Sequence, residues 1–163
     1  MQQISILGCG WLGFPLALSL KRKGYFSKGS TTSKEKLAIL SEHGIEPYLI
    51  HLTENTIGGK IDSFLAGSQT LIINVPPGMR GQNAPPFSKK IKALIPFIET
   101  SEVKQVLFVS STSVFSDIQG KVDEGTPPQP DSASGKELFK AEQLLMKNDF
   151  FKTTVVRFGG LLG

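Results

Sequence analysis

Three glycines near the N-terminus have the spacing of a phosphate-binding loop. The stretch "SILGCGWLG" places Gly8, Gly10 and Gly13 directly after an apolar run and directly before a helical pattern. In a G-x-G-x-x-G loop the first glycine allows a tight turn, the second lets a pyrophosphate approach the backbone, and the third lets helix and strand pack closely. The N–H groups at the start of the helix would face the phosphates. The loop therefore predicts dinucleotide binding; the alternative is that its glycines serve only the turn.

The other residues of this loop have two interpretations each. Trp11 and Leu12 fill its free positions, and we count them among the candidate cofactor contacts, although packing over the loop on a neighbouring strand is the favoured role. Cys9 is the only cysteine in the chain, so no internal disulfide is expected. A small buried residue in a crowded loop is favoured for Cys9 over a redox thiol.

The end of the second predicted strand lacks the acid that usually selects NAD. An Asp or Glu there would accept a hydrogen bond from the ribose 2′-hydroxyl, but "KGSTTSKEK" has no acid before Glu35. Its hydroxyl groups and a cation would suit a 2′-phosphate, so NADP is favoured and NAD stays open. The residues concerned are Ser30, Thr31, Thr32 and Lys34. The letters "TSKE" also predict a capping box from Thr32 to Glu35, and both roles can hold together.

A proline-rich stretch, "NVPPG", follows the fourth predicted strand. Because its prolines restrict the backbone, we expect Asn74, Val75 and Pro76 to border the cofactor. A rigid exit from the strand is the alternative interpretation.

Short apolar runs alternate with helical patterns along the chain, as repeated βα units do. The predicted strands are Ile4–Leu7, Tyr25–Ser30, Pro47–Leu52, Thr70–Val75, Gln105–Ser110 and Thr153–Phe158. The predicted helices are Leu12–Lys23, Lys34–His43, Ile61–Ala66, Ser88–Glu99 and Ser134–Lys147. Continuous apolar strands such as "TLIINV" are typical of a parallel sheet buried on both faces. The sequence therefore predicts an NAD(P)-binding Rossmann fold, a three-layer α/β/α structure with a doubly wound parallel sheet of order 3-2-1-4-5-6.

Three later stretches follow the glycine loop in a characteristic order: "QVLFVSSTSVF", "VDEGTPPQP" and "VVRFGGLLG". Together they resemble the short-chain dehydrogenase/reductases, in particular the extended, NAD-dependent epimerase/dehydratase-like branch. The resemblance covers nearly the whole chain. It implies that Ser111 stands at the catalytic serine position, and that Ser110 beside it orients a substrate or the nicotinamide amide.

The active-site helix of that branch carries Tyr-x-x-x-Lys, followed four residues later by a glutamate. Aligning that glutamate with Glu142 places Ser134 and Leu138 at the tyrosine and lysine positions. In the family the tyrosine exchanges a proton with the substrate while the lysine lowers its pKa. A serine hydroxyl is far too weak an acid to replace it at neutral pH. Ser134 stays a candidate catalytic residue with Ser111, and we expect both to border one cleft beside the glycine loop.

Two classes of function follow from this resemblance. The first is an NAD(P)-binding oxidoreductase or epimerase-like enzyme with a degenerate catalytic site, acting on a small molecule such as a nucleotide sugar or a carbonyl compound. The second is a catalytically silent dinucleotide sensor or interaction module of the same fold. The opening motif also resembles hydroxyacid dehydrogenases, but "SSTSVF" and "EGTPPQP" are foreign to those enzymes.

Length and composition are those of one globular domain, residues 1–163, which we expect to lack a C-terminal substrate-binding region. The net charge of +4 is spread over short basic groups, which does not favour nucleic-acid binding. No apolar run reaches the roughly 18 residues of a membrane span, and no signal peptide is evident, so a cytoplasmic location is expected. Neither His43 nor His51 lies in a metal-ligand cluster, so no metal is expected, and a homodimer is left open.

Overall fold

The structure, a computed structural model, describes residues 2–78 and 85–161. The main sheet contains β1 (Gln3–Leu7), β2 (Phe26–Thr31), β3 (Glu46–Leu49), β6 (Thr70–Ile73), β7 (Gln105–Ser111) and β8 (Lys152–Phe158). The α-helices are α1 (Gly13–Arg22), α2 (Glu35–Glu42), α3 (Ile61–Leu65), α4 (Phe87–Glu99) and α5 (Ala133–Met146). In these ranges no helix has the length and apolar character that crossing a membrane requires.

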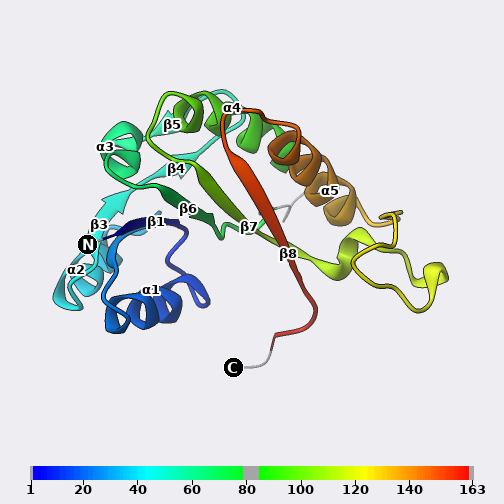
Figure 1. The fold of residues 1–163 in the computed structure, drawn as a ribbon, viewed down its shortest axis with the longest axis horizontal. Coiled ribbons are helices and arrows are strands. Elements are labelled where there is room, and N and C mark those ends of the chain that lie inside the picture. The colour runs from blue at the N-terminus through cyan, green and yellow to red at the C-terminus, as the bar shows by residue number, and fades with distance from the viewer. Residues whose placement is uncertain (1, 79–84, 162–163) are drawn as a thin grey trace.

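All neighbouring strands of the main sheet are parallel, in the order β3-β2-β1-β6-β7-β8. This is the predicted doubly wound order, so the predicted Rossmann fold is confirmed. Helices α1 and α2 lie on one face of the sheet, and α3, α4 and α5 lie on the other (Figure 1). The carboxyl ends of β1 and β6, where the strand order reverses, lie side by side in the middle of the sheet.

Each face of the sheet has its own hydrophobic core, because side chains point alternately to the two faces along a strand. On β1, Ile6 packs with Leu40 of α2 on one face, while the next residue, Leu7, packs with Ile91 of α4 on the other. Helix α4 presents a fully buried stripe at helical spacing, made of Phe87, Ile91, Leu94 and Ile98. Such a stripe is what makes a helix cover a sheet, and it positions the start of α4 beside the carboxyl end of β6.

The predicted strand Pro47–Leu52 is wrong as a single element. Strand β3 ends at Leu49, and the buried Ile50 donates its backbone N–H to the carbonyl oxygen of Thr31 at 3.0 Å. The following residues form β4 (His51–Leu52), which pairs antiparallel with β5 (Ile57–Gly58) outside the main sheet. An uninterrupted apolar run does not show where a chain leaves one sheet and joins another.

The predicted capping box from Thr32 to Glu35 is also wrong. Strand β2 continues to Thr31, whose hydroxyl accepts a hydrogen bond from the N–H of Ser33 at 3.1 Å. The hydroxyl of Ser33 in turn donates to the carboxylate of Glu35, and α2 begins at Glu35 without a side-chain cap. Because the strand runs one residue further than predicted, the hydroxyl groups of Thr31 and Ser33 bond within the turn between β2 and α2.

Helix α5 is tied to the start of α4 by a buried carboxylate. Glu137 Oε2 accepts hydrogen bonds from the backbone N–H and the hydroxyl of Ser88, at 3.0 and 2.6 Å, and Glu137 Oε1 accepts from Lys140 at 2.8 Å. Burial alone would raise the pKa of Glu137, but the hydrogen bonds from Lys140 and Ser88 outweigh it and lower the pKa below the usual value. The ionised carboxylate thus caps α4, whose first N–H groups favour a negative charge.

Replacing Glu137 by glutamine should lower the free energy of unfolding by about 2 kcal/mol at neutral pH, since charged hydrogen bonds are lost. A lowered pKa in the folded state means that this contribution is complete above the unfolded pKa of about 4.3 and disappears as the pH falls through the folded value. Thermal unfolding of both proteins from neutral pH downward tests this. The two melting temperatures should converge in acid, and a constant difference would contradict the assignment.

Candidate functional site

The glycine loop connects β1 to α1 and has little room for side chains at two of its glycines. Gly8 has a φ of +102°, which favours glycine, and a Cβ there would lie 2.3 Å from the carbonyl oxygen of Asn74. A Cβ at Gly13 would lie 2.1 Å from the carbonyl oxygen of Gly8. A Cβ at Gly10 would meet nothing within 4 Å. Gly8 and Gly13 therefore serve packing, while the backbone at Gly10 is open to a ligand.

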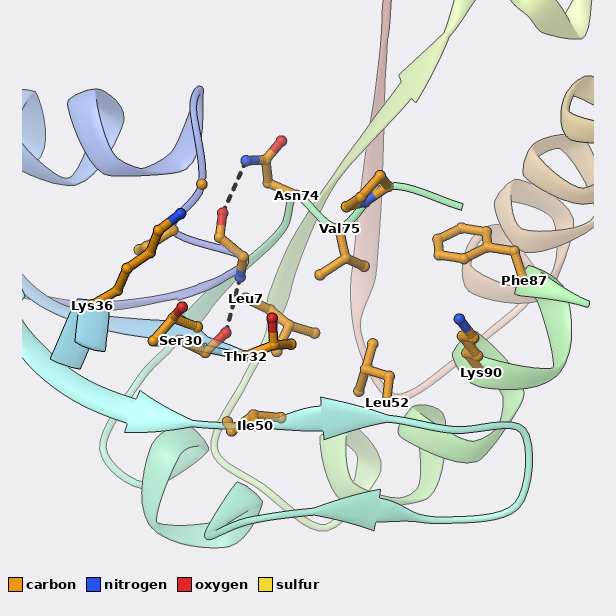
Figure 2. Close-up of a pocket in the computed structure, with 15 residues that line it drawn as sticks. Leu7, Ser30, Thr32, Lys36, Ile50, Leu52, Asn74, Val75, Phe87 and Lys90 are labelled. Atoms are coloured by element: carbon orange, nitrogen blue, oxygen red, sulfur yellow. Dashed lines mark hydrogen bonds between the residues drawn. The ribbon is translucent and has the colours of Figure 1, made fainter. Parts of the chain in front are cut away.

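Two polar side chains hold this loop from opposite sides (Figure 2). The backbone N–H of Gly8 donates to the Ser30 hydroxyl at 2.9 Å, and the Asn74 side-chain amide donates to the carbonyl oxygen of Gly8 at 3.0 Å. The N–H of Cys9 also donates to the carbonyl oxygen of Ser30 at 2.7 Å. Ser30 and Asn74, predicted as cofactor contacts, thus hold the glycine loop in position.

The first pocket, of about 300 Å³, opens beside the glycine loop. It is lined by Leu7, Gly8, Cys9, Gly10, Ser30, Thr31, Thr32, Lys36, Ile50, Leu52, Asn74, Val75, Pro76, Phe87 and Lys90. Figure 2 shows Lys36 and Lys90 on opposite sides of the pocket, with Leu52 and Val75 between them. No acidic side chain occurs among these lining residues, so the described wall combines apolar surface with positive charge.

Of the two lysines at the start of α2, Lys36 lines the first pocket, and Lys34, the predicted cofactor contact, does not. Lys34 precedes α2 and is exposed, and it is not among the described residues that line the first pocket. Successive helical residues are rotated by about 100°, so positions 34 and 36 face nearly opposite directions. Once α2 begins at Glu35, Lys36 lies toward the glycine loop.

A second hollow, the apolar cleft, lies on the other side of the same loop and has a volume of about 420 Å³. Its lining residues are Gly10, Trp11, Leu12, Asn74, Val75, Pro76, Pro77, Val109, Ser110, Ser111, Leu138, Phe158, Gly159 and Leu161. The first pocket and the apolar cleft share Gly10, Asn74, Val75 and Pro76. The two hollows are therefore neighbours that meet at Gly10, and together we call them the groove.

Both predicted serines of β7 reach the apolar cleft, but their hydroxyl groups have partners. The Ser111 hydroxyl accepts from the N–H of Ser113 at 3.1 Å and begins a short 3₁₀-helix, η1 (Thr112–Val114). The Ser110 hydroxyl donates to Glu142 at 2.6 Å, and that carboxylate also binds Arg157 at 3.1 and 2.7 Å. The two serines thus organise the wall of the cleft through contacts with the rest of the fold.

Helix α5 contributes Leu138 to the apolar cleft, where this side chain is 5% exposed. Ser134 is half-buried, and it is not among the described residues that line the cleft, so the expectation that Ser111 and Ser134 border one cleft is not met. The first turn of α5 is pressed against η1, since a Cβ at Gly135 would lie 2.0 Å from the carbonyl oxygen of Ser113. Leu138 and Ser111 thus line the cleft, while Ser134, one helical turn before Leu138, lies outside its lining.

Two further side chains of the loop, those of Trp11 and Cys9, differ in their exposure. Trp11 is 60% exposed at the apolar cleft, so the favoured packing of its ring on a neighbouring strand is wrong. Cys9 is buried, and its sulfur fills the space above Gly29, where a Cβ would lie 2.7 Å away. Burial raises the pKa of the Cys9 thiol to about 12, so the thiol is protonated at neutral pH. This agrees with the favoured structural role of Cys9.

No family model matches the chain. The chain is 30% identical over 164 residues to Protein YeeZ of Escherichia coli K12, covering all of this chain and 60% of that protein. The UDP-glucuronic acid 4-epimerase of Bacillus cereus, in complex with UDP-glucuronic acid and NAD, superposes with a TM-score of 0.78 at 18% identity, over 96% of this chain and 56% of that one. A putative NAD-dependent epimerase/dehydratase from Methylobacillus flagellatus superposes with a TM-score of 0.68 at 24% identity, over 99% and 55%.

These likenesses establish the fold. The structure matches the N-terminal, Rossmann portion of NAD-dependent epimerase/dehydratase proteins, so the resemblance predicted from the sequence is confirmed at that level. The chain spans 60% of the length of its relative YeeZ.

Proposed function

We propose that the protein binds a nicotinamide dinucleotide along the groove that crosses the glycine loop, and that it prefers NADP(H). The observation that carries this proposal is the open backbone at Gly10, located where the first pocket meets the apolar cleft. The adenosine half would lie in the first pocket, on Leu52 and Val75. The pyrophosphate would cross Gly10 near the start of α1, whose N–H groups favour anions.

The preference for NADP(H) follows from the charges of the first pocket. A 2′-phosphate would extend from the ribose toward the end of β2, where Thr32 offers a hydroxyl and Lys36 a cation. The described lining contains no carboxylate to accept a hydrogen bond from a free 2′-hydroxyl or to repel a phosphate. The Bacillus cereus epimerase carries NAD, so this preference rests on Lys36 and Thr32 alone.

Calorimetric titration with NADPH and NADH tests this proposal. Replacing Lys36 by alanine should weaken NADPH binding about tenfold and leave NADH binding nearly unchanged, because only NADPH places a phosphate beside this cation. Lys34→Ala is the matched control. It removes the same charge two residues earlier in the chain, and the Lys34 side chain does not line the first pocket. Equal losses in both variants would point to a general effect of charge, and a wild type that binds neither nucleotide would refute the proposed function.

We propose further that the catalytic site is degenerate. The alignment through Glu142 assigns Leu138 to the lysine position of the resembled family, and the serines of the apolar cleft have internal hydrogen bonds. General acid–base groups contribute about 10²–10⁴-fold to rate, and the described cleft residues supply none. A dinucleotide sensor or binding module is therefore favoured over an enzyme.

An enzyme whose proton donor comes from residues outside the described cleft is the second candidate. Its support is the likeness to the epimerase, which binds a nucleotide sugar. Following NADPH absorbance with carbonyl compounds, and analysing the sugar products formed from UDP-glucose in the presence of NADP⁺, separates the two candidates. Steady turnover would favour the enzyme, and no turnover despite tight NADPH binding would favour the sensor.

A further inference from the structure

We propose that the groove distinguishes the two redox states of the dinucleotide and binds NADPH more tightly than NADP⁺. The proposed function, on which this inference rests, puts the adenosine half in the first pocket and the pyrophosphate across Gly10. The nicotinamide and its ribose would then continue into the apolar cleft, which Gly10 also lines. The two redox states differ at that ring, which carries a positive charge in NADP⁺ and none in NADPH. Such a protein would respond to the ratio of the two forms.

The wall of the apolar cleft offers no negative charge to a cationic ring. Its described lining contains no Asp or Glu, and its apolar side chains include Leu138, Phe158 and Leu161. A charged group that leaves water for such a wall loses hydration without gaining a counter-charge, whereas the neutral ring of NADPH loses much less. The wall therefore favours the reduced form.

Glu142 contacts this wall from inside the protein, but its charge is already compensated. The hydroxyl of Ser110, a lining residue, donates to the Glu142 carboxylate at 2.6 Å. Glu142 is 1% exposed, and the Arg157 guanidinium donates to it at 3.1 and 2.7 Å. Opposite charges at such short distances largely cancel each other at longer range. Glu142 is therefore a poor counter-charge for an oxidised nicotinamide.

The charges that line the rest of the groove are positive. Lys36 and Lys90 stand on opposite sides of the first pocket (Figure 2), whose described lining has no carboxylate either. Helix α1 begins at Gly13 next to the glycine loop, and a helix N-terminus carries a partial positive charge. These charges attract the phosphates that both forms share. They repel a cationic ring, the more distant lysines more weakly because of screening.

The polar groups of the apolar cleft suit the parts of the dinucleotide that both redox states share. Ser111 Oγ accepts from the N–H of Ser113, so its own proton can be donated to a ligand. In the contacts of the described residues, the Asn74 side chain uses one N–H, which leaves Oδ1 and the second N–H for a ligand. A carboxamide and ribose hydroxyl groups offer matching donors and acceptors. These contacts would hold the nicotinamide end without selecting its charge.

Trp11 opposes this preference in part. Its indole is 60% exposed and lines the apolar cleft. An exposed aromatic face attracts a cation by about two- to fivefold in affinity. The lost hydration of an unpaired charge against the apolar wall is the larger effect. We therefore expect a net preference of about tenfold for NADPH over NADP⁺.

The test compares three ligands that share the same adenosine half and pyrophosphate. These are NADPH, NADP⁺ and 2′-phospho-ADP-ribose, which has no nicotinamide. In calorimetric titrations of the wild type, NADPH should bind about tenfold more tightly than NADP⁺. NADPH should also bind more tightly than 2′-phospho-ADP-ribose, because only a dinucleotide has a ring to place in the apolar cleft. Lys36→Ala should weaken NADPH and NADP⁺ nearly equally, since Lys36 lines the first pocket and not the cleft.

Leu161→Glu tests whether the missing counter-charge is the cause. Leu161 lines the apolar cleft and is 44% exposed, so thermal unfolding should show that the variant folds as the wild type does. Its new carboxylate should lower the preference for NADPH about threefold, since exposed charges attract each other only weakly. Leu161→Gln, which has the same shape without the charge, should keep the tenfold preference. Comparing NADPH with NADP⁺ within each variant cancels the repulsion between the glutamate and the shared phosphates.

The outcomes separate this inference from the proposed function. NADP⁺ binding as tightly as NADPH, or NADPH binding no more tightly than 2′-phospho-ADP-ribose, would overturn the inference while the proposed function stands. An equal preference in Leu161→Glu and Leu161→Gln would also overturn it. Binding of none of the three ligands would refute the proposed function and this inference with it.

Discussion

Replacing Gly10 by valine should weaken NADPH binding by roughly a hundredfold or more while the protein keeps its stability. A Cβ at Gly10 meets no protein atom within 4 Å, so the fold accepts a side chain there. Gly10 lines both the first pocket and the apolar cleft, and the proposed dinucleotide would cross it with its pyrophosphate close to the backbone. Calorimetry with NADPH, together with thermal unfolding, measures both quantities.

Gly13→Ala is the matched control for this loop. Its added methyl group would lie 2.1 Å from the carbonyl oxygen of Gly8, so the loop or the start of α1 must shift. Overpacking of this kind costs about 1–3 kcal/mol of stability. We expect Gly13→Ala to unfold at a lower temperature and Gly10→Val to unfold normally. A Gly10→Val protein with unchanged NADPH affinity would mean that the loop serves the turn alone, the alternative left open by the sequence.

Replacing Glu142 by alanine should lower the free energy of unfolding by about 3 kcal/mol. We expect this to be the largest loss from replacing a single charged residue. Glu142 is 1% exposed and joins three elements, because its carboxylate accepts from Ser110 on β7 and from Arg157 on β8. Removing it leaves the Arg157 guanidinium, which also lies over the ring of Phe115 at 5.2 Å, without its counter-charge. Denaturant unfolding at neutral pH measures the loss.

Glu54→Ala provides the comparison, because it removes another glutamate that has a cationic partner. Glu54 and Lys89 lie 3.3 Å apart, but their side chains are 36% and 59% exposed. Exposed pairs contribute about 0–1 kcal/mol, so this variant should unfold nearly as the wild type does. If Glu142→Ala were equally mild, the Ser110–Glu142–Arg157 contacts would not hold the wall of the apolar cleft, and the Ser110 hydroxyl would be free to act on a ligand.

The amino-acid sequence by itself determined the order of the main-sheet strands and of the helices, the glycine loop and the Rossmann fold. These features depend on neighbours within a few residues, such as the apolar run of β1 followed by Gly8, or the buried stripe of α4 at helical spacing. The helix that carries Leu138 and Glu142 could also be predicted from spacing alone, because the periodic pattern lies inside one element. At such positions the residue types and their spacing within one element are enough to predict the local structure.

The direction and the partners of the site side chains were decided only by the tertiary structure. Ser30 holds the glycine loop across 22 residues, Asn74 across 66, and Ser110 meets Glu142 across 32. The exposed ring of Trp11 and the turn that brings Lys36 into the first pocket likewise depend on how β2, β6 and α2 meet around one loop. A hydrogen bond or a packing contact needs its partner within a few ångströms, and that distance follows from the whole fold, whereas a pattern along the chain reports only on its own segment.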